Sequence, residues 1–287
     1  MTRANCVHID LDGAWANDAA HSAASIPYVD CRSWGPGLRY SSPVRGIEEF
    51  SRFVEDKLAP FTLFGSGDFH HLTALWLRRI QEPFVLVSFD NHPDWDIRPP
   101  KWCCGTWINR ALELPMLRQA VIWGCGNFEL NFPGYLFVNG KALREKRLEV
   151  WPWKERLKRS GLKRWHGITR ETWKDSFTSF ARQIAGQKVY VTVDLDCLTS
   201  EESTTNWENG LFASDDIVWA LGELRRQSEI IGGDLCGAWS KPAYARWRQR
   251  IEAELDHPKA AVAHDAASSA RNQRSCEVIW TEMTKAT

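Results

Sequence analysis

The stretch "FVLVSFDNHPDWD", Phe84 to Asp96, joins an apolar run to a dense group of acids around one imidazole. The run Phe84 to Phe89 has the length and residue types of a buried strand. Asp90, His92 and Asp94 follow at two-residue steps, so their side chains point to one side where the strand ends. Carboxylates this close repel one another and are costly to bury. The pattern therefore predicts a cation at the end of this strand.

Two further polar segments follow apolar runs in the same way. "VTVDLDCL" carries Asp194 and Asp196 at its strand end, and "GSGDFHH" carries His70 and His71 after the run Phe61 to Phe64. In open parallel sheets, ligands gather outside the carboxyl ends of the strands. Oxygen donors with one imidazole per ion suit manganese, magnesium or zinc, and no cysteine stands among the obvious ligands, which disfavours a thiolate site. Two ions about 3.5–4 Å apart make hydroxide available at neutral pH, so the pattern favours hydrolysis.

Strand-like runs alternate along the chain with segments of helical spacing. This order predicts an α/β fold with a mostly parallel sheet covered by helices on both faces. We expect one α/β domain over residues 1–257 and a loosely attached tail over 258–287, where the chain becomes small and polar. The charged segment Lys141 to Arg164 is typical of a solvated helix or a surface insertion. The expected strands are Cys6–Ile9, Phe61–Phe64, Phe84–Phe89, Ala120–Trp123, Lys188–Val193 and Ile230–Leu235.

Composition excludes several classes of partner. Lys plus Arg equals Asp plus Glu at 36 each, so no overall field would draw in nucleic acid or an anionic membrane. No signal-like or membrane-spanning apolar stretch is found, which indicates a cytoplasmic protein. The eight cysteines are expected to be reduced thiols, and a homo-oligomer is left open. Five tryptophans flank the polar motifs and are candidates for the walls of a pocket, namely Trp95, Trp102, Trp107, Trp207 and Trp239.

In order and approximate separation, the three motifs resemble those of the ureohydrolase family of arginase and agmatinase. These are binuclear manganese enzymes that release urea from guanidino groups. "GSGDFHH" is similar to the family's Gly-Gly-Asp-His turn, "DNHPD" to its Asp-Ala-His-x-Asp, and "TVDLDCL" to its Ser-x-Asp-x-Asp. The resemblance covers roughly residues 60 to 240 and implies the three-layer α/β/α sandwich of arginase.

The resemblance also implies a cofactor and its ligands. It implies two Mn²⁺ ions, with other divalent cations open, and bridging roles for Asp90 and Asp194. His70 is preferred to His71 because "HHLTALWL" then aligns its apolar stripe with the family's helix. The implied metal ligands are His70, Asp90, His92, Asp94, Asp194 and Asp196.

The catalytic proton transfers are less clearly matched. Asp94 and Asp196 are expected to help orient the nucleophile. In "CGTWINRA", Cys104 stands where the family has a histidine that shuttles protons. A thiol with an ordinary pKa of about 8.5 is a poorer acid or base near neutrality, so an unassigned histidine or a water relay stays open beside Cys104.

The substrate-binding residues depart from the family as well. Where the family has a glutamate that receives the guanidinium, "GGDLCGAWSKP" offers Gly237 and Ala238. Guanidinium pairs well with a planar carboxylate, so another carboxylate is expected in the pocket. The candidates are Asp96 beyond the second motif, Asp234 before the altered position, and Glu208 on a glycine-containing loop.

These residues favour one function and leave two alternatives open. The leading hypothesis is metal-dependent hydrolysis of a guanidino-type C–N bond. Its substrate is arginine within a peptide, as in the divergent members known as peptide arginases, or a small guanidino compound. The first alternative is a single-zinc amide deacetylase of the same fold, which would not need so many ligands. The second is a degenerate relative that binds a cation or a guanidino ligand without turnover.

Overall fold

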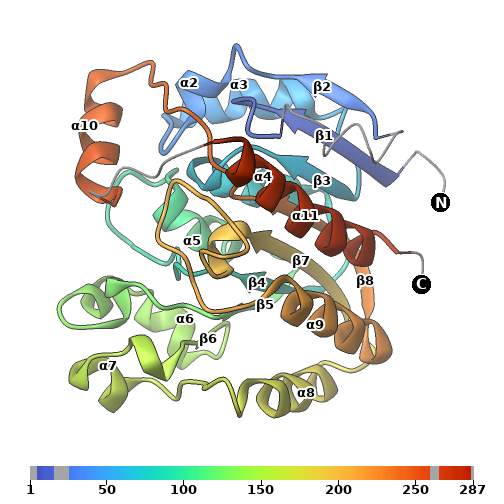
Figure 1. The fold of residues 1–287 in the computed structure, drawn as a ribbon, viewed down its shortest axis with the longest axis vertical. Helices are drawn as coiled ribbons and strands as arrows, with labels where there is room; N and C mark the ends of the chain where they lie inside the picture. The colour runs from blue at the N-terminus through green and yellow to red at the C-terminus, as the bar shows by residue number, and fades with distance from the viewer. Residues whose placement is uncertain (1–4, 16–25, 259–264, 286–287) are drawn as a thin grey trace.

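A parallel sheet forms the centre of the protein, which we describe from a computed structural model over residues 5–15, 26–258 and 265–285. The eight strands are ordered β2-β1-β3-β8-β7-β4-β5-β6, and every neighbouring pair is parallel (Figure 1). Their bounds are β1 Cys6–Asp10, β2 Tyr28–Asp30, β3 Phe61–Phe64, β4 Phe84–Phe89, β5 Leu117–Trp123, β6 Leu148–Trp151, β7 Lys188–Asp194 and β8 Glu229–Cys236.

Helices cover both faces of this sheet. One layer consists of α8 (Trp173–Gln183), α9 (Ser214–Gln227) and α11 (Ala266–Met283). The opposite layer contains α3 (Val44–Val54), α4 (Thr73–Trp76), α5 (Trp107–Ala111) and α6 (Gly140–Arg144). The short α2 (Gly35–Leu38), α7 (Arg159–Arg164) and α10 (Trp247–Asp256) complete the α-helices of the described residues. The prediction of a three-layer α/β/α sandwich with a parallel sheet is confirmed.

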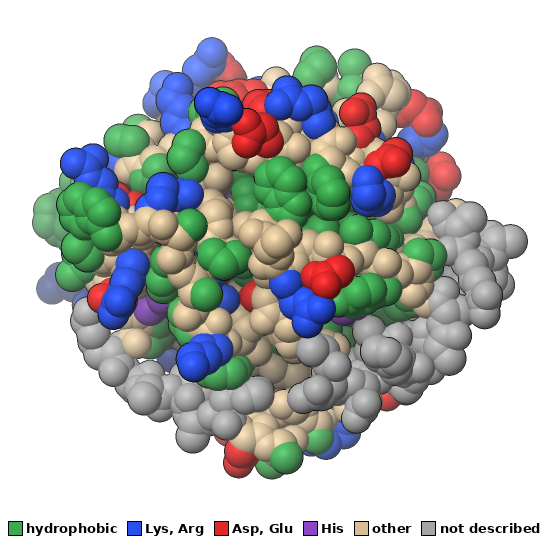
Figure 2. Space-filling model, turned by 90° about the horizontal axis from the view of Figure 1, so that it is seen from above, with side chains coloured by type: hydrophobic (Ala, Val, Ile, Leu, Met, Phe, Trp, Pro, Cys, Tyr) green, Lys and Arg blue, Asp and Glu red, His purple; other side chains and the backbone are tan. Residues whose placement is uncertain are grey.

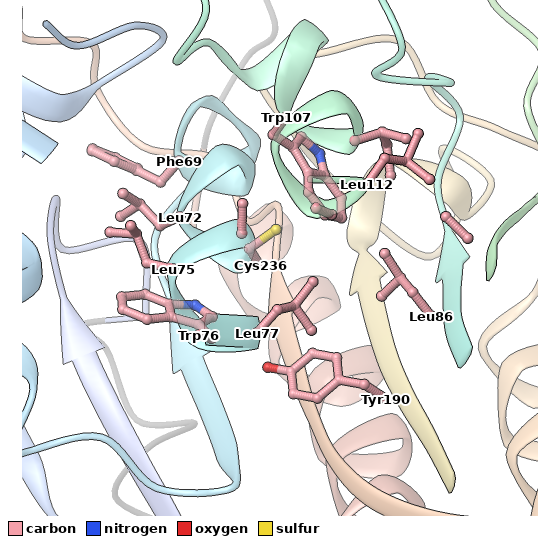
Figure 3. Close-up of a cluster of buried hydrophobic side chains, with 14 of the residues drawn as sticks. Phe69, Leu72, Leu75, Trp76, Leu77, Leu86, Trp107, Leu112, Tyr190 and Cys236 are labelled. Carbon is pink, nitrogen blue, oxygen red and sulfur yellow. The ribbon is translucent and has the colours of Figure 1, made fainter. Parts of the chain in front are cut away.

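Side chains of the central strands alternate between two cores. In β4, Phe84 and Leu86 pack toward α3 to α6, whereas Val85, Val87 and Phe89 pack toward α8, α9 and α11. The same two-residue alternation determines to which face of the sheet the side chains at the strand ends point. Figure 3 shows part of the core on the α3 to α6 side.

Each predicted strand is present, but the sequence missed the two edge strands. β2 has three residues and lies largely exposed, so it carries no hydrophobic signal. The segment Lys141 to Arg164 was wrongly interpreted as a solvated helix or insertion, because it contains α6, α7 and between them β6, which pairs with β5. The four residues of β6, LEVW, alternate between buried and half-buried positions. So short an edge strand gives only a weak hydrophobic pattern within a segment that contains many charged residues.

The prediction that residues 258–287 form a loosely attached tail is also corrected by the structure. Its described part, 265–285, contains α11, which packs against α9 and β8. Trp280 is buried in the core, and the Asn272 amide exchanges hydrogen bonds of 2.7 Å each with the backbone N–H and C=O of Thr204. A face that buries polar side chains through hydrogen bonds resembles a solvated segment in composition, which explains the error.

Charged side chains of both signs are mixed on the one face of the molecule that Figure 2 shows. On the face in Figure 2, Lys and Arg side chains alternate with Asp and Glu among hydrophobic and other atoms. No disulfide joins any of the eight cysteines, all of which lie in described residues, as expected for reduced thiols. None of the described helices is long and apolar enough to cross a membrane.

Candidate metal centre

The predicted metal ligands lie at the carboxyl edge of the sheet, beyond β3, β4 and β7. His70 belongs to a 3-10 helix, η2 (Gly67–Leu72), which begins soon after β3. Asp90, His92 and Asp94 follow β4, and Asp194 ends β7, with Asp196 in the next 3-10 turn. Because β3, β7 and β4 are all central strands, their ends meet in a region closed off from most solvent.

One group of donors surrounds His70. The Nδ1 atom of His70 lies 3.1 Å from Asp90 Oδ2, 3.4 Å from Asp94 Oδ2 and 3.6 Å from Asp194 Oδ2. Among the residues that the structure describes, no hydrogen-bond partner lies at either ring nitrogen of the neighbouring His71, and burial lowers its pKa to about 3. The structure therefore directs His70, and not His71, toward the carboxylates.

A second group forms around His92 and shares one carboxylate with the first. His92 Nδ1 lies 2.8 Å from Asp196 Oδ2 and 3.7 Å from Asp90 Oδ1. Asp90 thus turns one oxygen toward each histidine. A carboxylate in this orientation is suited to bridge two cations.

The electrostatics of these residues suit a cation. Burial, followed by repulsion from Asp90, raises the pKa of Asp94 to about 7 and that of Asp196 to about 6. Burial and repulsion from Asp196 raise the pKa of Asp194 to about 8. Although burial opposes it, hydrogen bonds to Asp90 and Asp94 raise the pKa of His70 well above its usual value. Divalent cations would replace the protons that these groups retain, so the donor set fits a metal centre.

A left-handed backbone conformation at Asp94 orients the second carboxylate of the loop that follows β4. Asp94 has φ +48°, a conformation that few residues other than glycine adopt and that often occurs at functional sites. Its Oδ2 accepts a hydrogen bond of 2.6 Å from Nε1 of the buried Trp107. The turn and this hydrogen bond hold the carboxylate beside His70.

The other side of His70 is held by a chain of hydrogen bonds that ends at Asp234. His70 Nε2 lies 2.9 Å from Thr192 Oγ1, which donates to Asp234 Oδ1 at 2.5 Å. Tyr190 OH donates to the other oxygen of Asp234 at 2.9 Å. Thr192 and Asp234 together fix the ring orientation of His70 through its Nε2 atom. Its Nδ1 atom is therefore left to face the carboxylates.

The donors line a pocket whose mouth carries further acids and aromatic rings. Its inner part contains the donors described above together with Gly67, Cys104 and Gly105. Its outer part is formed by Asn127, Phe128, Glu129, Trp207, Glu208 and Asp256. The arrangement can bind cations within and a positively charged group at the mouth.

Comparison with known proteins agrees with this architecture. No family model matches the chain. An uncharacterized protein of Thermotoga maritima is 28% identical over 202 residues, which cover 70% of this chain and 67% of that protein. The proclavaminate amidino hydrolase of Streptomyces clavuligerus is 16% identical, with a TM-score of 0.55 over 98% of this chain and 92% of that chain. Arginase from Medicago truncatula is 13% identical, with a TM-score of 0.56 over 98% and 88%. The chain has the arginase-like fold.

The arginase-like fold brings every predicted ligand into the same pocket. His70, Asp90 and Asp94 form one group of possible metal donors, and Asp90, His92 and Asp196 form another. Asp194 lies beside the first group. Their role as ligands, and the bridging roles of Asp90 and Asp194, stay predictions.

Two predicted substrate-binding residues lie elsewhere in the arginase-like fold. The Asp96 carboxylate forms a two-pronged ion pair with Arg98, with Nε to Oδ2 at 2.9 Å, and lines a different hollow. Asp234 is fully buried beneath His70 and does not line the pocket. Neither residue lies in the pocket, which corrects the expected placement: the Asp96 carboxylate already has a guanidinium partner, and Asp234 is hydrogen-bonded through Thr192 behind His70.

The remaining candidates do line the pocket. Cys104 is buried there, and burial with the neighbouring Cys103 raises the pKa of its thiol well above the usual value. A thiol that keeps its proton is poorly suited to shuttle protons near neutrality. Glu208 lies at the mouth, with Oε2 at 3.4 Å from His92 Nε2. Its side chain is 53% exposed, so a substrate can reach it.

Of the two residues that stand where the family has its glutamate, Gly237 and Ala238, the first has no room for a side chain. Gly237 has φ +103°, and a Cβ there would lie 2.1 Å from Asp194 Oδ1 and 2.4 Å from the backbone nitrogen of Leu195. The glycine lets the chain pass directly against the carboxylate of Asp194. A carboxylate side chain at position 237 would therefore require Asp194 or the backbone to move.

The sequence missed the residues that approach the mouth from β5 and α10. Asn127, Phe128 and Glu129 follow β5, and the rule that ligands gather at strand ends would have pointed to them. Asp256, at the end of α10, carried no local signal. Of the five tryptophans expected as walls, Trp207 lines the pocket.

The other four tryptophans that were expected to wall the pocket do not line it, which corrects that prediction. Trp107 does not line the pocket itself, but it donates a hydrogen bond to Asp94 and its ring lies 4.8 Å from that of His70. Trp95 packs on Trp165, Trp102 lies beneath Arg78, and Trp239 lines a separate hollow.

The role of Asp234 gives a testable consequence. Asp234→Asn should weaken binding of the first metal equivalent by roughly 10- to 100-fold, because partners that orient a metal-binding histidine have effects of that size. Competition with a chromophoric chelator measures this affinity. Asp96→Asn, which removes a carboxylate outside the pocket, should leave it unchanged. Equal affinities in Asp234→Asn and the unaltered chain would contradict the orienting role.

Proposed function

We propose that the protein is a metal-dependent hydrolase of a guanidino-type C–N bond, a divergent ureohydrolase that releases urea. The main support is the geometry of Asp90, which turns one oxygen toward His70 and the other toward His92 inside a pocket. The arginase-like fold adds to this, because the named structures that share it include an arginase and an amidino hydrolase.

We propose two divalent cations, with manganese as the expected pair. His70 and Asp94 would hold one ion, His92 and Asp196 the other, and Asp90 and Asp194 would be shared. When bound, such a pair lowers the pKa of a water molecule and so supplies hydroxide at neutral pH. The carboxylates of Asp94 and Asp196 would accept hydrogen bonds from that nucleophile and orient it.

The guanidinium of the substrate would be received at the mouth of the pocket. Glu208, on a loop, and Asp256, the last residue of α10, both line the pocket, and the indole of Trp207 offers a surface for a planar cation. Burial raises the pKa of Glu129, beside them, to about 8, and an arriving cation would favour its ionised form. These acids would provide the charge that Gly237 cannot.

The open mouth also suits a substrate larger than a free amino acid. Phe128 lines the pocket and is 64% exposed, so it can contact groups outside it. We therefore propose arginine within a peptide, or a small guanidino compound, as the substrate.

Urea release tests this proposal. The manganese-loaded protein is incubated with free arginine, agmatine, guanidinobutyrate and an arginine-containing peptide, and urea and ammonia are measured. We expect urea from at least one of them, and none from the Asp90→Ala variant. Preference for the peptide over free arginine would support the peptide substrate.

The degenerate relative stays as a second candidate because Cys104 and Gly237 replace the family's catalytic and substrate-binding residues. Calorimetric binding of the peptide by metal-loaded protein, with neither urea nor ammonia released, would favour this candidate. The number of ions per chain adds a further distinction, since a single tightly bound zinc would favour the deacetylase.

A further inference from the structure

Cys236 lies directly against the first group of metal donors. It ends β8 and is fully buried, and Figure 3 shows its sulfur among the side chains between η2 and Trp107. Its Sγ is 3.4 Å from Asp194 Oδ2, and the same oxygen is 3.6 Å from His70 Nδ1. The three donor atoms of His70, Asp194 and Cys236 all lie within 4.8 Å of one another.

The sheet explains this placement. β8 lies between β3, which leads to His70, and β7, which ends at Asp194. Cys236 is paired in register with Asp194. Leu235 points into the opposite core, so Cys236 shares its face with Asp234, which supports His70. Cys236 therefore occupies the floor of the pocket beside the first ion position.

We propose that Cys236 is a sulfur ligand of the ion held by His70, which rests on the metal centre of the proposed function. The thiol would release its proton to solvent as the metal–sulfur bond forms. Zinc binds nitrogen and oxygen at about 2.0–2.2 Å and sulfur at about 2.3 Å, so two donors that make a near-tetrahedral angle at the ion lie about 3.3–3.6 Å apart. The N···O separation of 3.6 Å and the O···S separation of 3.4 Å match this spacing.

A thiolate would change which metal the first position prefers. Carboxylate donors alone suit manganese, whereas a sulfur donor shifts preference toward zinc, cobalt or ferrous iron. The sequence analysis disfavoured a thiolate site, because Cys236 stands outside the three strand-end motifs that carry the predicted ligands, and the sheet topology brings it to the donors. Within the described part of the chain, no group of metal donors includes another cysteine.

A purely structural role makes a different prediction. The Cys236 thiol lies within hydrogen-bonding distance of Asp194, and as a donor it would only position that carboxylate. In that case its sulfur would stay protonated and would have no bond to the metal. A spectroscopic signal of the bond itself therefore separates the two roles.

Cobalt provides that signal. Co²⁺ is titrated into metal-free protein, and the first equivalent should produce an intense near-ultraviolet sulfur-to-cobalt charge-transfer band. In Cys236→Ser the band should be lost while the visible cobalt bands persist, because cobalt stays bound by nitrogen and oxygen. Cys125→Ser is the matched control, since Cys125 is equally buried but belongs to no group of metal donors, and it should keep the band.

X-ray absorption of the unaltered, zinc-loaded chain tests the bond without any substitution. The zinc spectrum should be described only when a sulfur atom at about 2.3 Å from the zinc ion is included. A band that persists in Cys236→Ser, or a zinc spectrum described by nitrogen and oxygen alone, would overturn the inference, and this second test decides if Cys236→Ser fails to fold. Metal bound without sulfur refutes only the role of Cys236, whereas a chain that binds no metal refutes the proposed function as well.

Discussion

Replacing Asp90 by alanine is expected to remove at least one cation per chain and to lower urea release by at least about a thousandfold. Asp90 is the carboxylate that faces both His70 and His92, so its loss affects both ion positions. Loss of a metal-derived nucleophile removes several kcal/mol of transition-state stabilisation, and about 4 kcal/mol corresponds to three factors of ten in rate. Metal content by mass spectrometry and initial rates of urea release measure the two effects.

The matched control for this experiment is Asp96→Asn. Asp96 lies in the same loop as Asp90, but its carboxylate pairs with Arg98 in a separate hollow. We expect this variant to keep its metal and most of its activity. If Asp90→Ala folds, as judged by circular dichroism, and binds as much metal as the unaltered chain, the bridging assignment is wrong.

The sequence predicted the central strands and the pocket because both depend on local rules. Side chains alternate along a strand, so Asp90 follows β4 toward the same side as Leu86 and can be located without knowing the rest of the molecule. The same rule located Asp194 at the end of β7. The carboxyl-end rule for parallel sheets then joins the separate motifs in one place.

That rule failed where the chain leaves the strand geometry. Asp96 continues the two-residue spacing of Asp90, His92 and Asp94, yet it points elsewhere because Asp94 adopts a left-handed conformation and turns the chain. Nothing in the spacing reveals a positive φ at an aspartate. The ion pair of Asp96 with Arg98 is a consequence of this turn.

Contacts between distant segments were also beyond the sequence. Asp234 was interpreted as a substrate contact, but Tyr190 and Thr192 of β7 bind its two oxygens. Which side chains flank it depends on the strand order β3-β8-β7, which periodicity alone does not specify. Cys236 escaped notice for the same reason, since its neighbour Asp194 comes from the adjacent strand.

Gly237→Ala is expected to cost more than about 3 kcal/mol of the free energy of unfolding and to abolish binding of the first metal equivalent. At φ +103° a side chain is strained, a penalty of about 1–2 kcal/mol in left-handed regions. In addition, the new Cβ would lie 2.1 Å from Asp194 Oδ1, so the carboxylate has to move away. Large losses of stability are typical of strain at a special backbone position combined with a clash. Urea denaturation and metal content measure the two effects.

Gly186→Ala separates backbone strain from the clash with the carboxylate. Gly186 also has a positive φ, +76°, but a Cβ there would meet no atom within 4 Å. This variant should therefore lose only the backbone contribution of about 1–2 kcal/mol and keep its metal. If both variants lose the same stability and both bind metal normally, then the contact between Gly237 and Asp194 does not constrain the centre. In that case the close approach of Gly237 to Asp194 would not explain why the family's glutamate is absent from this position. A metal loss confined to Gly237→Ala would instead mean that this chain cannot use the family's mode of guanidinium binding while it keeps its present backbone.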